Sequence, residues 1–194
     1  MLIVHSRAIS IVLVAMMYSV TARSEDPQPV GEFAKSISAD WIFVPELSDE
    51  FDGETVDAKR WDTNTEDFGV WSWEPENTYQ DGGKLHLQMV QESHQRDGLR
   101  LDYKSGIARS YGTMTYGYLE ARVKGCSLYP GASPAFWLHS KGKDNRYVAK
   151  DGETVVYSEI DVIELQQCEF DNKTKQRCSV QRIDCNLHAG LLKS

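Results

Sequence analysis

Long apolar runs, helical periodicity and an excess of basic residues are all missing from this sequence of 194 residues. With 21 Lys and Arg against 29 Asp and Glu, the formal net charge of −8 argues against a protein that binds nucleic acid non-specifically. CxxC pairs are also missing, which disfavours a zinc site among Cys126, Cys168, Cys178 and Cys185. Internal repeats and low-complexity tracts do not occur, so the chain has the composition of one ordinary globular domain.

The apolar segment near the N-terminus is too short to span a bilayer. It runs from Ala8 to Met17, behind His5 and Arg7, and the small residues Val20-Thr21-Ala22 follow it. A spanning helix needs about 20 apolar residues. We therefore interpret residues 1–22 as a secretory signal peptide cleaved near Ala22, with an N-terminal membrane anchor as the alternative. The mature chain is expected to be secreted, extracellular or periplasmic, without membrane attachment and monomeric.

The 4 cysteines of an exported chain allow three disulfide pairings. We favour Cys168 with Cys178, a pair that would close a loop around the polar stretch 171–177. No cofactor is expected, and the sequence leaves a structural calcium ion open.

Alternation of apolar and polar residues dominates the chain beyond a polar linker, residues 23–38. Short β-like runs, separated by turn signals, recur about every ten residues. They lie at 41–44, 84–90, 106–110, 116–124, 135–138, 155–165 and 183–187. This spacing is typical of antiparallel sheets, so residues 39–194 are predicted to form an all-β sandwich or jelly roll.

Three carboxylates, Glu159, Asp161 and Glu164, lie in the longest β-like run, among apolar neighbours. Side chains alternate between the faces of a regular strand, so Glu159 and Asp161 share a face while Glu164 points to the other. A carboxylate buried there without a partner would cost several kcal/mol. One extra residue at Val162-Ile163 removes the conflict, and β-bulges recur beside active sites. We therefore predict a bulge that returns Glu164 to the face of the other two acids.

Two carboxyl groups about 5–5.5 Å apart are what a retaining glycosidase needs. One attacks the anomeric carbon; the other protonates the leaving oxygen and later deprotonates water. Asp161 can hydrogen-bond and orient the nucleophile. Repulsion among the acids raises the pKa of the group, which suits an acid that must stay protonated. The alternatives are a calcium site, although calcium draws its ligands mainly from loops, or a solvated acidic strand, although clustered like charge destabilises a sheet.

The run Glu159-Ile-Asp-Val-Ile-Glu164 resembles the ExDxxE signature of glycoside hydrolase family 16. Further blocks resemble that family in the expected order: 46–53 with 56–57 and 59–61, then 116–124, then 134–138. The resemblance covers residues 41 to 190 and implies a concanavalin-like β-jelly roll with a glycan cleft across its concave sheet. By motif position it makes Glu159 the nucleophile, Asp161 its helper and Glu164 the general acid/base.

The bulged spacing resembles that of laminarinases, agarases, porphyranases and kappa-carrageenases, whereas lichenases and xyloglucan-active relatives lack the extra residue. The amino-acid sequence of residues 157–165 resembles that of the galactan-active branches. Basic residues that would attract a sulfated glycan, unless Asp144 and Asp151 simply pair with them, are Lys141, Lys143, Arg146 and Lys150. We expect a secreted retaining endo-glycosidase acting on β-linkages of a polysaccharide, a sulfated marine galactan, with a laminarinase-type β-1,3-glucanase as the alternative.

Further candidate glycan contacts each have a structural alternative. Trp137, in a family block that lines the cleft, could stack on a sugar or belong to the core. Trp71 and Trp73 share a face and suit sugar stacking, or pack in a loop on the sheet edge. Arg109 could bind a hydroxyl or sulfate, or form a salt bridge. His188 lies where family members often have a histidine near the acid/base, and could equally be structural.

The predicted sandwich lacks room for its last strands, because only 30 residues follow Glu164 whereas family domains place the acids near mid-domain. Missing C-terminal strands would leave unpaired edges and exposed core surface. We therefore expect the chain as written to be unstable or inactive unless it is continued. Outside the enzyme class, the alternatives are a non-catalytic carbohydrate-binding jelly roll and an inactive fragment, although a binder has no need for paired glutamates.

Overall fold

The computed structural model describes residues 2–5, 28–37, 40–67, 70–126, 132–140, 147–148, 150–151 and 154–193. The chain forms two compact units, Met1–Glu120 and Ala121–Ser194. Strands dominate both units, as the alternating pattern predicted, and α1 (Glu32–Ser36) is the one α-helix in the described ranges. In those same ranges, no helix is both long enough and apolar enough to cross a membrane.

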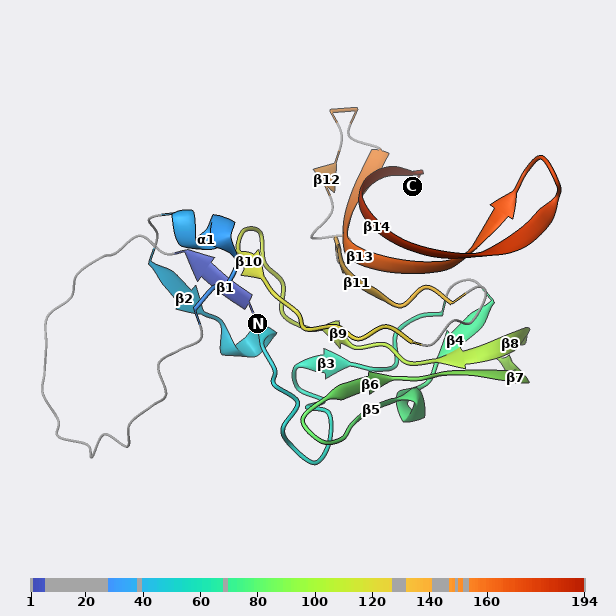
Figure 1. Ribbon diagram of the computed structural model, residues 1–194, viewed down its shortest axis with the longest axis horizontal. Coiled ribbons are helices and arrows are strands. Elements are labelled where there is room, and N and C mark those ends of the chain that lie inside the picture. Colours follow the sequence, from blue (N-terminus) through green and yellow to red (C-terminus); the bar gives the residue numbers. More distant parts are fainter. Residues whose placement is uncertain are drawn as a thin grey trace, which may run out of the picture. The chain divides into compact units, whose positions relative to one another are not determined.

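The first unit consists of short strands arranged in four small sheets. Its strands are β1 (Leu2–His5), β2 (Trp41–Phe43), β3 (Trp61–Asp62), β4 (Trp71–Trp73), β5 (Thr78–Gln80), β6 (Leu85–Leu87), β7 (Met89–Arg96), β8 (Leu99–Ser105), β9 (Arg109–Ser110) and β10 (Tyr118–Leu119). The short 3₁₀ helices η1 (Pro45–Leu47) and η2 (Pro75–Asn77) interrupt them. The sheets have the orders β10-β1-β2, β3-β9, β4-β8-β7 and β5-β6, and β4 pairs with β8 in parallel (Figure 1).

Asp81, Gly82 and Gly83 lie in a tight turn between two strands. Asp81 and Lys84 exchange both backbone hydrogen bonds, at 3.0 and 3.2 Å, and so close a two-residue hairpin between β5 and β6. Gly82 and Gly83 have φ of 55° and 68°, the positive values that a type I′ turn requires at both central positions. Glycine therefore fixes this hairpin.

The expected strand over 116–124 is wrong in its extent, because only Tyr118–Leu119 pairs as β10. The side chains around β10 instead hold part of the expected linker. Gly31 N–H donates to the Tyr118 hydroxyl at 3.1 Å, and Val30 N–H to Glu120 Oε2 at 3.4 Å. The described part of the linker thus carries α1 and is anchored, while the expected cleavage site near Ala22 lies outside the described residues.

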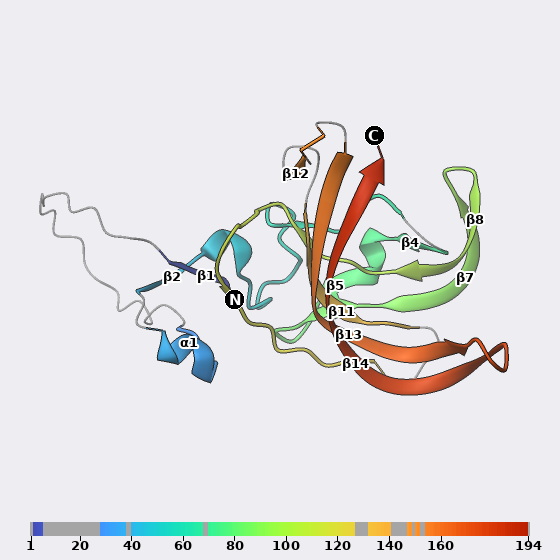
Figure 2. The same ribbon diagram turned by 90° about the horizontal axis from the view of Figure 1, so that it is seen from above.

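The second unit is one antiparallel sheet in which β13 (Thr154–Asp171) pairs with each of the other strands, β11 (Ala135–His139), β12 (Tyr147–Val148) and β14 (Gln176–Lys193). β13 and β14 form a long, strongly curved hairpin, and β11 lies along β13 (Figure 2). At the hairpin end, both carboxylate oxygens of Asp171 accept hydrogen bonds at 2.8 Å, from Lys173 N–H and the Thr174 hydroxyl. Both strands run to this turn and so extend beyond the predicted 155–165 and 183–187.

One face of this sheet is apolar and remains exposed within the described residues. The register places Leu138 and Leu187 on either side of Ile160, and places Ile183 opposite Leu165. Leu187 is 80% and Ile183 63% exposed. Such a face packs against a second sheet in a sandwich. This face therefore has the apolar character of the inner face of a sandwich.

The favoured disulfide stays a prediction. The register of the hairpin sets Cys168 opposite Ser179 and Cys178 opposite Glu169, so the two cysteine positions are offset by one residue. The side chain of Cys178 lies outside the described residues.

Candidate active site

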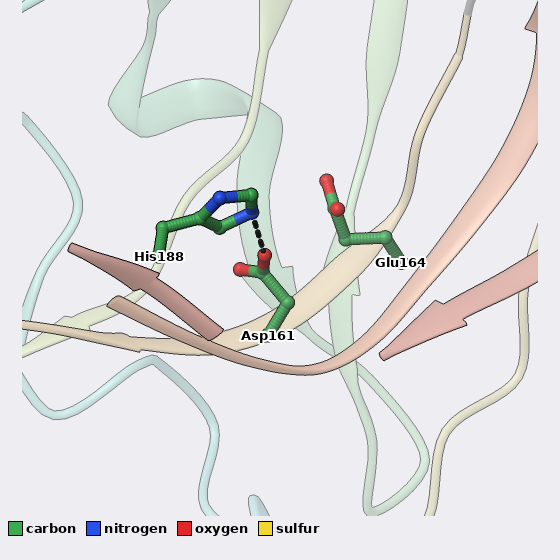
Figure 3. A group of neighbouring side chains, drawn as sticks. All are labelled: Asp161, Glu164 and His188. Carbon is green, nitrogen blue, oxygen red and sulfur yellow. Dashed lines mark ion pairs between the residues drawn. The ribbon is translucent and has the colours of Figure 1, made fainter. Parts of the chain in front are cut away.

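The predicted bulge in β13 is confirmed by its pairing with both neighbouring strands. Asp161 lies opposite Asn186 and Glu164 opposite Asp184, so three steps along β13 match two steps along β14. β11 shows a register shift at the same place. Glu164 therefore returns to the face of Asp161, and Figure 3 shows both carboxylates on the same side of the strand.

A cysteine thiol stabilises the bulge. The S–H of Cys185, which lies between Asn186 and Asp184 on β14, donates to the backbone carbonyl of Val162 at 3.2 Å. A bulge disrupts the ladder locally, so a side-chain donor there satisfies a carbonyl that regular pairing would have satisfied. The sequence had offered Cys185 only as a disulfide partner.

Each of the two acids beside the bulge has a partner on β14. Asp161 is 4% exposed, and its Oδ2 lies 3.0 Å from Nε2 of His188 (Figure 3). The amide Nδ2 of Asn186 donates to Oε2 of Glu164 at 3.1 Å. His188 is thus in the acid cluster as expected, but its ion pair is with Asp161, while the direct contact of Glu164 is an asparagine that the sequence did not single out.

Glu159 is half-buried, and its surroundings disfavour the ionised form of its carboxyl group. Burial raises its pKa, and Asp161, which repels it and shares a hydrogen bond with it, raises the pKa further. His139 and His188 act in the opposite direction. The sequence had assigned a raised pKa to the acid that must stay protonated; in the structure, the predicted nucleophile has one. The reason is position, because Asp161 is two residues away on the same strand and therefore on the same face.

The same cluster has a spacing that a metal ion could use. One ligand atom each from Asp161, Glu164 and His188 lies within 4.8 Å of the other two. However, His188 Nε2 already faces Asp161, and Oε2 of Glu164 accepts from Asn186. We therefore interpret the cluster as a network of charges and hydrogen bonds, and assign no metal to it.

An aromatic row borders the acids on the same face. Trp137 pairs with Asp161 across the strands, so the predicted tryptophan does lie beside the acid cluster. Its ring contacts His139 edge-on at 5.6 Å, and His139 stacks on Tyr157 at 5.4 Å. His139 and Tyr157 were not among the residues predicted from the sequence. The available signal was their spacing, because His139 lies two residues after Trp137 and Tyr157 two residues before Glu159.

The remaining candidates lie in the first unit. Trp71 and Trp73, on β4, are half-buried and contact each other edge-on with ring centroids 5.8 Å apart. Arg109 donates to Asp62 Oδ2 at 2.6 Å, the salt bridge that the sequence offered as its alternative role. Glycan contacts for these three residues stay predictions.

Of the basic residues expected to attract sulfate, Lys150 is exposed in a turn, and Lys141, Lys143 and Arg146 lie outside the described residues.

Known proteins resemble this chain in sequence and in fold. The chain is 43% identical to the kappa-carrageenase of Pseudoalteromonas carrageenovora over 165 residues, which are 79% of this chain and 38% of that enzyme. A solved 1,3-α-1,4-β-D-galactose-4-sulfate-3,6-anhydro-D-galactose 4 galactohydrolase is 41% identical and superposes with a TM-score of 0.62, over 79% of this chain and 56% of its own. The P. carrageenovora kappa-carrageenase solved with an oligotetrasaccharide of kappa-carrageenan is 35% identical with a TM-score of 0.55, over 76% and 62%.

These structures are jelly rolls, and the sheet of β11, β13 and β14 is part of that fold. The chain spans less than half the length of its curated carrageenase relative. The family model described as β-porphyranase A–D, GH16 domain, matches residues 41–190, the same region that the sequence blocks marked out. The chain therefore belongs to glycoside hydrolase family 16.

Proposed function

We propose that this chain carries the acid cluster of a retaining endo-glycosidase that cleaves β-linkages in a sulfated galactan of the kappa-carrageenan kind. Glu159 attacks the anomeric carbon and forms a glycosyl-enzyme ester, while Glu164 gives its proton to the departing glycosidic oxygen. Glu164 then takes a proton from water as that water attacks the ester, and Glu159 leaves as a carboxylate. Asp161 hydrogen-bonds Glu159 and orients it.

The observation that carries this proposal is the bulge between Asp161 and Glu164. Without the extra residue, Glu164 would face the apolar side of the sheet, beside Ile160 and Leu187. With it, the expected acid/base shares a face with the expected nucleophile. A purely structural strand gains nothing from three carboxylates on one face, because like charges there destabilise the sheet.

The substrate class rests on the relatives. The solved galactohydrolase is named for a galactose 4-sulfate and 3,6-anhydrogalactose polymer, and the carrageenase complex holds a kappa-carrageenan oligosaccharide. Trp137 beside Asp161 offers an aromatic surface on which a sugar ring can stack. Polysaccharides of this kind are too large to enter a cell intact, so we also propose export, with residues 1–22 as the signal peptide.

The test is an assay of the chain for new reducing ends on kappa-carrageenan, porphyran, agarose and laminarin, beside its Glu159→Gln variant. The proposal predicts that kappa-carrageenan is cleaved first, a result that would contradict the expectation of an inactive chain. It also predicts a loss on the order of 10⁶-fold in the variant, which is typical when a nucleophile is removed. Binding of the polysaccharide, measured by affinity electrophoresis, should persist in the variant.

Other outcomes would identify the alternatives. Preference for laminarin would replace the galactan with a β-1,3-glucan. Binding without cleavage, unchanged by Glu159→Gln, would identify a carbohydrate-binding jelly roll, and neither binding nor cleavage an inactive fragment.

A further inference from the structure

Two histidines flank Glu159, one on each neighbouring strand. The register sets His139 of β11 directly opposite Glu159 on one side, and His188 of β14 directly opposite it on the other. Directly opposed residues in an antiparallel pair point to the same face, with Cβ atoms about 4.5–5.5 Å apart. Both histidines therefore lie on the face of Glu159, on the two strands that flank it.

Only one of these histidines is free to act on Glu159 alone. His188 lies 3.0 Å from Asp161 and forms an ion pair with that carboxylate. Among the described residues, the ring of His139 contacts Trp137 edge-on and stacks on Tyr157. These contacts fix the orientation of the imidazole ring without pairing it with a carboxylate of the described residues.

A glycine makes room for this arrangement. Gly190 lies opposite Tyr157 in the register, and a Cβ at residue 190 would collide with the ring carbons of Tyr157. The tyrosine ring therefore lies over the glycine backbone. Tyr157, His139 and Trp137 then form a continuous row on the face that carries Glu159.

A nucleophilic carboxyl group must be ionised to attack, and the surroundings of Glu159 oppose ionisation. Burial and Asp161 both raise its pKa. Charged or titratable side chains on this face come from β13 as Tyr157, Asp161 and Glu164, from β11 as His139, and from β14 as Arg182, Asp184 and His188. Arg182 is paired with Asp184 at 2.7 Å, opposite the far side of the bulge, so the cationic groups on the strands directly opposite Glu159 are the two imidazoles.

We propose that His139, held against Tyr157, is a positioning residue whose imidazolium keeps Glu159 in the carboxylate form that attacks the sugar. This inference rests on the proposed role of Glu159 as nucleophile. A positive charge within a few ångströms of a carboxyl group favours the ionised form of that group. His188 is paired with Asp161, whereas His139 acts on Glu159 from β11, the strand on the other side of β13.

The direct test is the titration of the Glu159 carboxyl carbon by NMR, in the full chain labelled with ¹³C at the glutamate side-chain carboxyl groups. Glu159→Gln identifies the resonance. We expect His139→Gln to move the Glu159 midpoint to higher pH, and His139→Lys, which restores a cation, to return it toward the wild-type position. The acid limb of the kcat/KM profile should move to higher pH in His139→Gln as well.

The chain offers a matched control. His86 stacks on Tyr79 at 4.9 Å, so His86→Gln also removes a histidine from a tyrosine ring, but in the first unit. The control should leave the Glu159 midpoint in place. Should His139→Gln fail to fold by circular dichroism, His139→Asn serves as the second neutral variant.

The inference is overturned by a Glu159 midpoint that is the same in His139→Gln as in the wild type, or the same in His139→Lys as in His139→Gln. The second result would mean that the histidine acts by its shape and not by its charge. The NMR titration needs no turnover. A chain that cleaves no glycan would thus refute the proposed function and still give a readable answer on His139.

Discussion

Two glutamates in this molecule stand beside a histidine and a second charged group, with opposite results. In the first unit, burial works to raise the pKa of Glu74, but the hydrogen bond from the Ser72 hydroxyl and the charge of Arg96 outweigh it and hold the pKa below its usual value. In the second unit, burial raises the pKa of Glu159, and Asp161 adds to the rise. The neighbours of Glu74 thus stabilise its negative charge, whereas the surroundings of Glu159 destabilise its negative charge.

The difference separates a structural network from the acid cluster that is proposed to be catalytic. Ser72 is fully buried, and its hydroxyl lies 2.8 Å from His94 Nε2, a pairing that elsewhere makes a nucleophile and its base. Here it donates to Glu74 at 2.7 Å and no substrate can reach it. Arg96 contacts both Glu74 and Asp67, at 3.3 and 3.1 Å. Satisfied charges of this kind hold β4 in place, whereas a carboxyl group whose pKa is raised by a neighbouring acid is a candidate for chemistry.

The largest expected effect tests the reactive side. Glu164→Gln should lower kcat/KM on the polysaccharide by about 10²–10⁴-fold, because general acid catalysis contributes that much. A substrate with an activated leaving group should lose far less in the first step. The thermal midpoint should stay within the error of the wild type. Unfolding of this variant would place Glu164 with Glu74 as a structural acid.

The next effect tests the structural side. Arg96→Met should lower the free energy of unfolding by about 3 kcal/mol, because it leaves Glu74 and Asp67 without their cation in a mostly buried place. Urea denaturation measures it. Lys35→Met, which removes an exposed ion pair with Glu32, is the control and should stay within about 0.5 kcal/mol. Equal losses in both variants would contradict the interpretation of Arg96.

Stability against pH should set the two glutamates apart directly. The folded pKa of Glu74 lies below the usual 4.5, so its contribution is present above that pH and is lost as the pH falls through the folded pKa. The folded pKa of Glu159 lies above 4.5, so its contribution is present at acid pH and is lost as the pH rises through the folded pKa. At neutral pH, Glu74→Gln should therefore cost about 1–3 kcal/mol of stability, whereas Glu159→Gln should stabilise the fold.

Urea midpoints at neutral and acid pH check both signs, and both differences from the wild type should shrink in acid. A Glu159→Gln variant that is less stable than the wild type at neutral pH would show that the cluster is structural.

A smaller effect is expected from the amides. Asn186→Ala removes the donor that holds Glu164, which is worth about 1 kcal/mol and hence several-fold in kcat/KM. Asn64→Ala, which removes the acceptor that Arg96 Nη2 contacts at 2.8 Å, should affect stability alone. Loss of activity in Asn64→Ala to the same degree would blur the distinction between the two networks.

The smallest effect is expected from metal removal. Treatment with a chelator should leave kcat unchanged, because the acid cluster is assigned no ion. A loss of activity that zinc or calcium restores would reassign Asp161, Glu164 and His188 to a metal centre.

The parts of the site that the sequence could predict are those governed by local alternation. The bulge followed from the cost of turning Glu164 into the apolar face, and β11, β13 and β14 followed from their apolar periods. Alternation alone puts His139 on the face of Trp137, but it could not show that His139 lies opposite Glu159 or that Asn186 contacts Glu164, because the residue opposite a given acid depends on register between strands. A shift of one position would have put neighbours of opposite character there.

The fold of the first unit was less predictable. β10 is much shorter than the apolar alternation over 116–124 suggested. The side chains of Tyr118 and Glu120 instead accept hydrogen bonds from the backbone of the segment around Gly31. The buried network around Ser72 depends on residues from two strands and a loop, and each of those residues alone looks like an ordinary surface residue in the sequence.

Gly190 carries a consequence for variation in this protein. Its backbone supports the ring of Tyr157 where any β-carbon would overlap that ring. In a saturation library at this codon, even alanine should displace the tyrosine and the histidine stacked on it. Position 190 should then be among the least tolerant in the domain, although it bears no side chain and touches no sugar.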